Sequence, residues 1–229
     1  MALKCAVCNA SVIGNDEGIC TQCGMSEKLV ECSSGHKVCG NCLDKAAYES
    51  IRNICLESTS SDPYDVFMQI IDDGKLRTHD FKHHVAVGSA LLAAHRNAGT
   101  RIDLELMLDE MRKRGSKIPP GACGLMGNCG AAVSVGTFLS ILTGTTPLSE
   151  DTWGDVNLAT AQCLIQLALI GGPRCCKRNS FIALKVGARI ASEKFGSEMD
   201  IPADPVCQMH DENPDCIRDR CPFYKSNVL

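Results

Sequence analysis

The first 42 residues constrain the fold most, because they cannot fold by hydrophobic burial alone. They carry few large apolar side chains but four closely spaced pairs of metal ligands. The pairs are Cys5 with Cys8, Cys20 with Cys23, Cys32 with His36, and Cys39 with Cys42. Four such pairs make two tetrahedral sites of the zinc type, in which the metal holds the loops together. The spacing does not decide whether consecutive pairs share a metal or alternate in a cross-brace.

This module, residues 1–42, is therefore expected to be zinc-finger-like. Its segment CSSGHKVCGNC resembles the middle of a RING-type finger, but the ligands before it come in a different order, which argues against ubiquitin-ligase function. We expect a structural role for the module. Docking of a protein partner and a redox role are the alternatives.

Cysteine content and charge narrow the class of protein further. The chain has 16 cysteines in 229 residues, and it begins without the charged region and apolar stretch of an export signal. We expect a cytoplasmic protein without membrane contact, in which close cysteines bind metal rather than form disulfides. Iron–sulfur chemistry would favour a low-oxygen cell. The net charge of -4 provides no basic surface, so nucleic acid is not an expected partner.

From residue 43 the pattern becomes helical, and the sequence predicts a mainly α fold with a bundle-like body over residues 43–200. Asp62 before Pro63 predicts one helix start, and Thr100 with Asp103 predicts a capping box at another. The last three helices are apolar around most of their circumference, which predicts burial. The expected helices cover residues 43–56, 63–74, 79–98, 104–115, 131–142, 156–170 and 179–195.

The tail, residues 201–229, contains a further set of four ligands in a polar stretch. We expect a third metal site here, in the form of a zinc clip that pins the tail to the body. An iron–sulfur cluster is the alternative, because thiolate-rich sites suit both. The expected ligands are Cys207, His210, Cys216 and Cys221.

Four cysteines of the body stand apart from the rest, because they lie in glycine-rich turns where helices are expected to begin. They are Cys123, Cys129, Cys175 and Cys176. Helix N-termini carry unpaired N–H groups that stabilise thiolates, and iron–sulfur clusters use such donors. Cluster or metal binding is the prediction, with a thiol redox pair or inert core as alternatives. Cys55 and Cys163, inside helical patterns, are predicted to be core residues.

Two of these segments resemble a known family. PPGACGLMGNCGAAVSVGTFLSILTGTTP and GGPRCCKRNSFIALKVGARIA resemble the iron–sulfur L-serine dehydratase α chain and the related cysteine desulfidases. The resemblance covers about residues 119–195 and implies that Cys123 and Cys175 are cluster ligands. The family's third cysteine falls near Leu167, so Cys176 or Cys129 would have to replace it. The whole chain also resembles an uncharacterised family of cysteine-rich proteins from anaerobes.

The dehydratase resemblance implies a [4Fe–4S] cluster with one open iron and a lyase or desulfidase-like reaction on a small thiol or hydroxy compound. A base is then required, and three histidines in THDFKHH are the candidates. Arg174 and Arg178 could bind a substrate carboxylate. A metal-binding adaptor, or a sulfur or iron carrier without turnover, is the alternative function, and a homodimer is an open expectation. The candidate bases are His79, His83 and His84.

Overall fold

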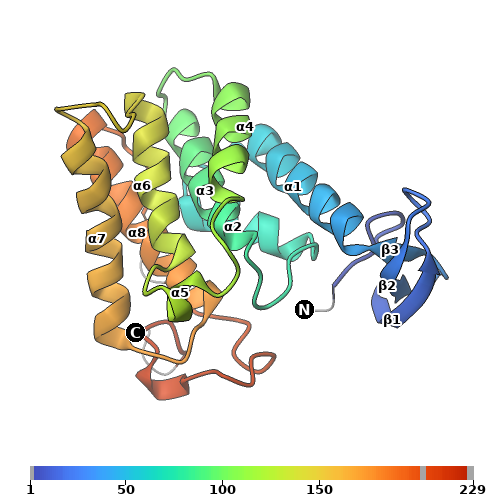
Figure 1. The fold of residues 1–229 in the computed structure, drawn as a ribbon. Coiled ribbons are helices and arrows are strands. Elements are labelled where there is room, and N and C mark those ends of the chain that lie inside the picture. Colours follow the sequence, from blue (N-terminus) through green and yellow to red (C-terminus); the bar gives the residue numbers. More distant parts are fainter. Residues whose placement is uncertain (1–2, 202–204, 226–229) are drawn as a thin grey trace.

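The computed structural model describes residues 3–201 and 205–225, and it confirms a mainly α fold with a small N-terminal sheet (Figure 1). Three antiparallel strands form this sheet in the order β1-β2-β3. Their turns bring the paired cysteines together. The strands are β1 (Val12–Ile19), β2 (Ser26–Cys32) and β3 (Lys37–Cys39).

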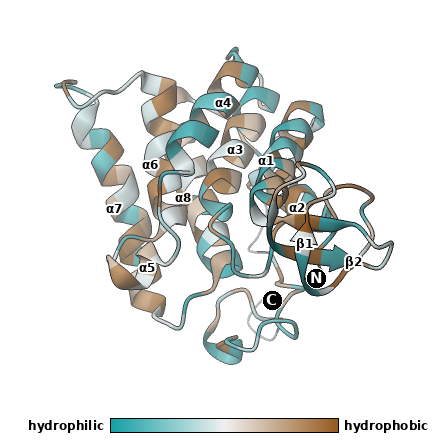
Figure 2. Ribbon diagram, turned by 45° about the vertical axis from the view of Figure 1, so that its right-hand side comes forward, coloured by the Kyte–Doolittle hydropathy of each residue, from teal (hydrophilic) through white to brown (hydrophobic). Residues whose placement is uncertain are grey.

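The body packs around α3, which is buried along nearly its whole length and contacts five other helices. Hydrophilic residues cover the visible side of α4 (Figure 2), as expected for an outer helix. The tail contains a short 3₁₀ helix, η1 (Arg218–Arg220). The α-helices are α1 (Gly40–Glu57), α2 (Pro63–Asp72), α3 (His83–Asn97), α4 (Leu104–Gly115), α5 (Ala122–Leu125), α6 (Gly130–Thr143), α7 (Trp153–Ile170) and α8 (Cys176–Phe195).

Local hydrogen bonds set where the helices begin. The Asp62 carboxylate accepts the Tyr64 backbone N–H at 2.8 Å, as predicted for an N-cap before proline. The predicted capping box that starts at Thr100 is wrong, because Asp103 itself caps α4 by accepting the Leu106 N–H at 3.1 Å. Helix α3 begins later than predicted, since the residues before it form a turn around the Asp80 carboxylate.

Burial of the last three helices differs from the prediction in one case. Helices α6 and α8 are buried as expected, but only Ala159 and Cys163 of α7 are buried. Leu169 of α7 is 83% exposed and Ile165 is 60% exposed. Helix α7 packs on α6 and α8 from the edge of the body, so only one side of it can be covered (Figure 1). Cys55 and Cys163 are fully buried, which confirms them as core residues.

The finger and the body have separate hydrophobic cores. Helix α1 nevertheless joins them, because it begins at Gly40 directly after β3, so that Cys42 lies in its first turn. The Lys4 N–H also donates to the Gly74 carbonyl at 2.8 Å. The predicted junction between body and tail borders residues 202–204, which lie outside the described residues. Within the described part, no helix combines the length and apolar character needed to cross a bilayer.

Candidate functional site

Eight ligands of the finger form two compact sets. Within each set the ligand atoms lie within 4.8 Å of one another, so each could hold one metal ion. The first and third pairs combine, as do the second and fourth, which is the cross-braced arrangement that the spacing left open. All seven cysteines are thiols. The sets are Cys5, Cys8, Cys32 and His36, and Cys20, Cys23, Cys39 and Cys42.

Backbone N–H groups stabilise thiolate in the finger, as metal ligation requires. Burial raises the pKa of Cys20, but N–H donors from Cys39, Cys23 and Gln22 outweigh it and lower that pKa to about 6. The Val7 N–H donates to the Cys5 sulfur at 3.4 Å. These turns therefore supply the donors typical of a thiolate metal site.

A second feature is an open cavity of about 440 Å³ between the finger and the body, here called the His84 cavity. Leu3, Gly40 and Leu43 line its finger side. Its remaining lining is mostly polar and combines thiol, imidazole, carboxylate and cationic groups. These polar residues are Asp44, Lys75, Arg77, His79, Asp80, Lys82, His84, Cys123, Arg174 and Cys176.

His84 is held at the start of α3 against α6. A Cβ added at Gly130, the first residue of α6, would lie 2.1 Å from the His84 ring, so only glycine leaves room for this imidazole. Burial lowers the pKa of His84, which keeps the ring neutral near pH 7. Its Nδ1 is buried without a hydrogen-bond partner, as is Nδ1 of His79. A neutral imidazole is suited to accept a proton.

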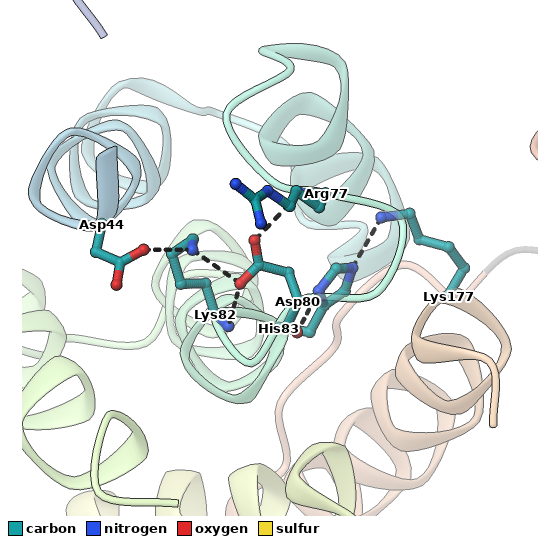
Figure 3. A network of polar contacts seen from close by, with 6 residues as sticks. All are labelled: Asp44, Arg77, Asp80, Lys82, His83 and Lys177. Carbon is teal, nitrogen blue, oxygen red and sulfur yellow. Dashed lines mark hydrogen bonds and ion pairs between the residues drawn. The ribbon is translucent and has the colours of Figure 1, made fainter. Parts of the chain in front are cut away.

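His83 does not line the His84 cavity. Its Nδ1 lies 2.9 Å from the Asp80 carbonyl and its Nε2 lies 2.8 Å from the Lys177 ammonium (Figure 3). Burial holds the pKa of His83 well below its usual value and lowers the pKa of Lys177 to about 8. The ring is thus a neutral link between α3 and α8, donating at Nδ1 and accepting at Nε2. Among the predicted bases, His84 and His79 line the cavity.

The cations of the cavity are only partly neutralised. The Asp80 carboxylate accepts the backbone N–H groups of Arg77 and Lys82, and the Lys82 ammonium lies 2.7 Å from Asp44 and 2.9 Å from Asp80 (Figure 3). Asp44 and Asp80 are the carboxylates of the lining, and Lys75 pairs with Asp73 at 2.9 Å, which leaves Arg77 and Arg174 as the other cations of the lining. The cavity is therefore suited to a small anion. Sequence reasoning missed Asp80 and Lys82, for which the charge-rich segment KLRTHDFKHH was the available signal.

A third feature is a narrower cavity of about 20 Å³ under the tail, here called the tail cavity. Cys175 lines it together with the tail thiols Cys207, Cys216 and Cys221. Arg178 and His210 also line it. The tail runs across the same end of the body as α5 (Figure 1), so both cavities lie near this end.

The four cysteines predicted to hold one cluster are thus divided. Cys123 and Cys176 line the His84 cavity, whereas Cys175 lines the tail cavity. Cys129, the N-cap of α6, accepts the Asn179 side-chain N–H at 3.3 Å. Cys123 and Cys175 thus line different cavities, and the shared cluster that the resemblance implies for them stays a prediction. Cys175 is in extended conformation as the N-cap of α8, and Cys176 is the first helical residue.

A helical body joined to a cross-braced finger, with thiols lining two further cavities, defines a cysteine-rich protein with metal-binding clusters. The model of a family of unknown function, DUF5714, matches residues 51–224, and the chain belongs to this family. The matched range includes both cavities' cysteines. No curated protein and no solved structure matches the chain. The resemblance to the dehydratase α chain therefore stays a prediction from the two motifs.

Proposed function

We propose that the protein is an iron–sulfur-dependent lyase or desulfidase-like enzyme that acts on a small anionic thiol or hydroxy compound in the His84 cavity. One observation carries the proposal: the cavity combines a neutral imidazole, an excess of cations and two thiols in one open space of about 440 Å³. A space of this size admits a molecule of amino-acid dimensions.

The cations favour a substrate with a carboxylate. Arg77 and Arg174 present guanidinium groups, which bind carboxylates through paired N–H donors. A carboxylate held there would place the adjacent carbon near His84. Its imidazole would then remove a proton from this carbon, the electron pair would form a carbon–carbon double bond, and the bond to sulfur or oxygen at the next carbon would break.

Three thiols at helix starts are the candidate ligands of the cluster. Cys123 lies in α5, Cys129 caps α6, and Cys176 begins α8. Burial raises the pKa of Cys176 to about 11, and Cys175 and Cys129 are both close enough to add to this effect, so a metal would have to displace the proton. When bound through three thiolates, a cluster supplies an open iron as a Lewis acid for the leaving sulfide or hydroxide.

The experiment uses the full chain, reconstituted anaerobically with iron and sulfide. It is incubated with L-cysteine and with L-serine, and release of 2-oxo acid, ammonia and sulfide is measured. We expect release that depends on the cluster and falls when Arg174 is replaced by Met. Lys185→Met, on α8 outside both cavities, is the control. Absence of product from cluster-loaded protein with every small anionic thiol or hydroxy acid tested would contradict the proposal.

A metal-binding adaptor is the second candidate function, favoured by the surface of the finger. Ile13, Ile19 and Met25 of this module are each at least 60% exposed, although they are large and apolar. Exposed apolar groups mark a docking surface where they form a contiguous patch. An adaptor would bind its metals and a protein partner without product release, so the same turnover assay separates the two functions.

A further inference from the structure

The tail cavity gathers four thiols from distant parts of the sequence. We infer that these thiols hold a second [4Fe–4S] cluster, separate from the site in the His84 cavity and independent of the proposed lyase activity. Three thiols come from the tail and the fourth from the N-cap of α8. The ligands are Cys175, Cys207, Cys216 and Cys221.

Turns of the tail fix the three thiols on its side. The Cys207 N–H donates to the Phe223 carbonyl at 2.8 Å, and the Cys216 N–H donates to the Asn213 carbonyl at 3.0 Å. Asn213 joins the tail to α8, because its side-chain N–H donates to the Cys175 sulfur at 3.7 Å. The tail is therefore folded against the helix start in a way that orients thiols toward one space.

The thiols of the tail cavity are not gathered as tightly as the ligands of the finger. Among the residues that the structure describes, ligand atoms gather within 4.8 Å of one another only in the two finger sets. A cubane binds its thiolates through four different irons, which places the sulfurs about 6–7 Å apart. All four thiols lie outside helix interiors, so their side chains can reorient around a cluster.

Buried cations provide an independent indication of an anionic ligand. Lys177 and Arg178 line the tail cavity and are each only 4% exposed, and no Asp or Glu is among its described lining residues. The Arg178 Nη1 is buried without a hydrogen-bond partner. Burying cations without a counter-charge is costly. The Asp80 carboxylate already acts on Lys177, and a negatively charged four-thiolate cubane would supply a counter-charge for Arg178.

In this proposal Cys175 takes the place that the sequence suggested for His210, although His210 also lines the cavity and its Nδ1 is buried without a hydrogen-bond partner. The His210 Nδ1 lies 2.8 Å from the Asp211 carboxylate, and its ring lies 5.1 Å from that of Tyr224. With four thiolates the cluster has no open iron. It therefore suits electron transfer and attachment of the tail, whereas substrate activation needs an open position.

The test compares neighbouring residues in the full chain after anaerobic reconstitution with iron and sulfide. Iron and acid-labile sulfide are measured per chain, and reduced samples are examined by electron paramagnetic resonance. We expect Cys175→Ser and Cys207→Ser each to lose about four irons per chain, as removal of one cubane requires. Cys176→Ser and His210→Ala are the matched controls and should keep the tail cluster.

The outcomes also separate this inference from the proposed function. If Cys176→Ser keeps every iron and Cys175→Ser loses all of them, the tail cluster stands and the cluster in the His84 cavity does not. If Cys175→Ser keeps full iron content, or if His210→Ala releases a zinc ion from the tail, the inference is overturned. Circular dichroism verifies that each variant is folded, and Cys216→Ser, on a tail turn, replaces any variant that is not.

Discussion

Two pairs of adjacent residues place their side chains in different surroundings. His83 links α3 to Lys177 inside the body, while His84 faces an open cavity. Cys175 and Cys176 line different cavities. One peptide unit thus separates groups of the same chemistry, and their proposed roles differ because of where each side chain lies.

His84 is the residue on which the proposed chemistry depends. We expect His84→Gln to lower turnover by about 10²–10⁴-fold, the usual contribution of a positioned base, with unchanged iron content. Because burial lowers the pKa of His84, the wild-type rate should fall with acidity only below about pH 6.5, where an ordinary histidine titrates. A pH–rate profile measures this. Wild-type turnover in the variant would exclude His84 as the base.

His95 provides a prediction about stability and pH that does not depend on metal. It is 1% exposed, contacts the Ser197 hydroxyl at 2.8 Å, and burial lowers its pKa. Below about pH 6.5 the unfolded chain takes up a proton that the buried ring resists, so stability falls as pH falls. Between pH 7.5 and 5 the free energy of unfolding, measured with urea, should decrease less in His95→Gln than in the wild type. An equally steep fall would contradict this.

At the residue scale, local spacing predicted the finger ligands, and the motifs predicted part of the His84 cavity lining but not its residues Asp80, Arg77 and Lys82. A metal site made of close pairs is visible in the sequence, since each pair lies within one turn. The tail cavity instead joins Cys175 to thiols more than thirty positions later, and such proximity depends on how the tail folds back. Arg77 and Lys82 likewise meet Cys123 only through tertiary packing.

At the scale of elements, small residues set how closely the helices pack. A Cβ at Gly136 of α6 would lie 2.2 Å from the Thr160 hydroxyl and 3.0 Å from the Val156 carbonyl of α7. We expect Gly136→Ala to lower the free energy of unfolding by about 1–3 kcal/mol, because α7 would have to move outward.

Gly154, in the first turn of α7, is the matched control for that substitution. No atom lies within 4 Å of a Cβ built there. Gly154→Ala should raise stability by up to about 1 kcal/mol, because alanine loses less backbone freedom than glycine in a helix. Both values come from urea unfolding, and equal effects of the two substitutions would argue against close α6–α7 packing.

Periodicity predicted most helices, because each is long and has clear stop signals. It missed α5, which spans only Ala122–Leu125, and it misjudged the burial of α7. An apolar pattern indicates which side chains a helix could bury. How much of α7 is covered depends on the position of this helix at the edge of the body. The predicted homodimer stays a prediction, for which the exposed side of α7 is the first surface to test by sedimentation.

At the scale of the whole molecule, the finger and the body depend on different stabilising forces. The finger has a small core built largely from its own metal ligands, and the body has a large aliphatic core. We expect Cys39→Ser to release finger metal and unfold the finger while the helical circular dichroism of the body persists. Met25→Ala, which alters an exposed finger side chain, is the control. Loss of the entire helical signal would show that the body needs the finger.

Because Leu3, Gly40 and Leu43 border the His84 cavity, its entrance is partly made by the finger. A partner protein bound to that side of the finger would lie next to the entrance of the cavity. Sulfide or another reactive product could then pass from one protein to the next without mixing into the surrounding solution. In that case the finger, through the partner that it binds, would also determine which protein receives the product of the cavity.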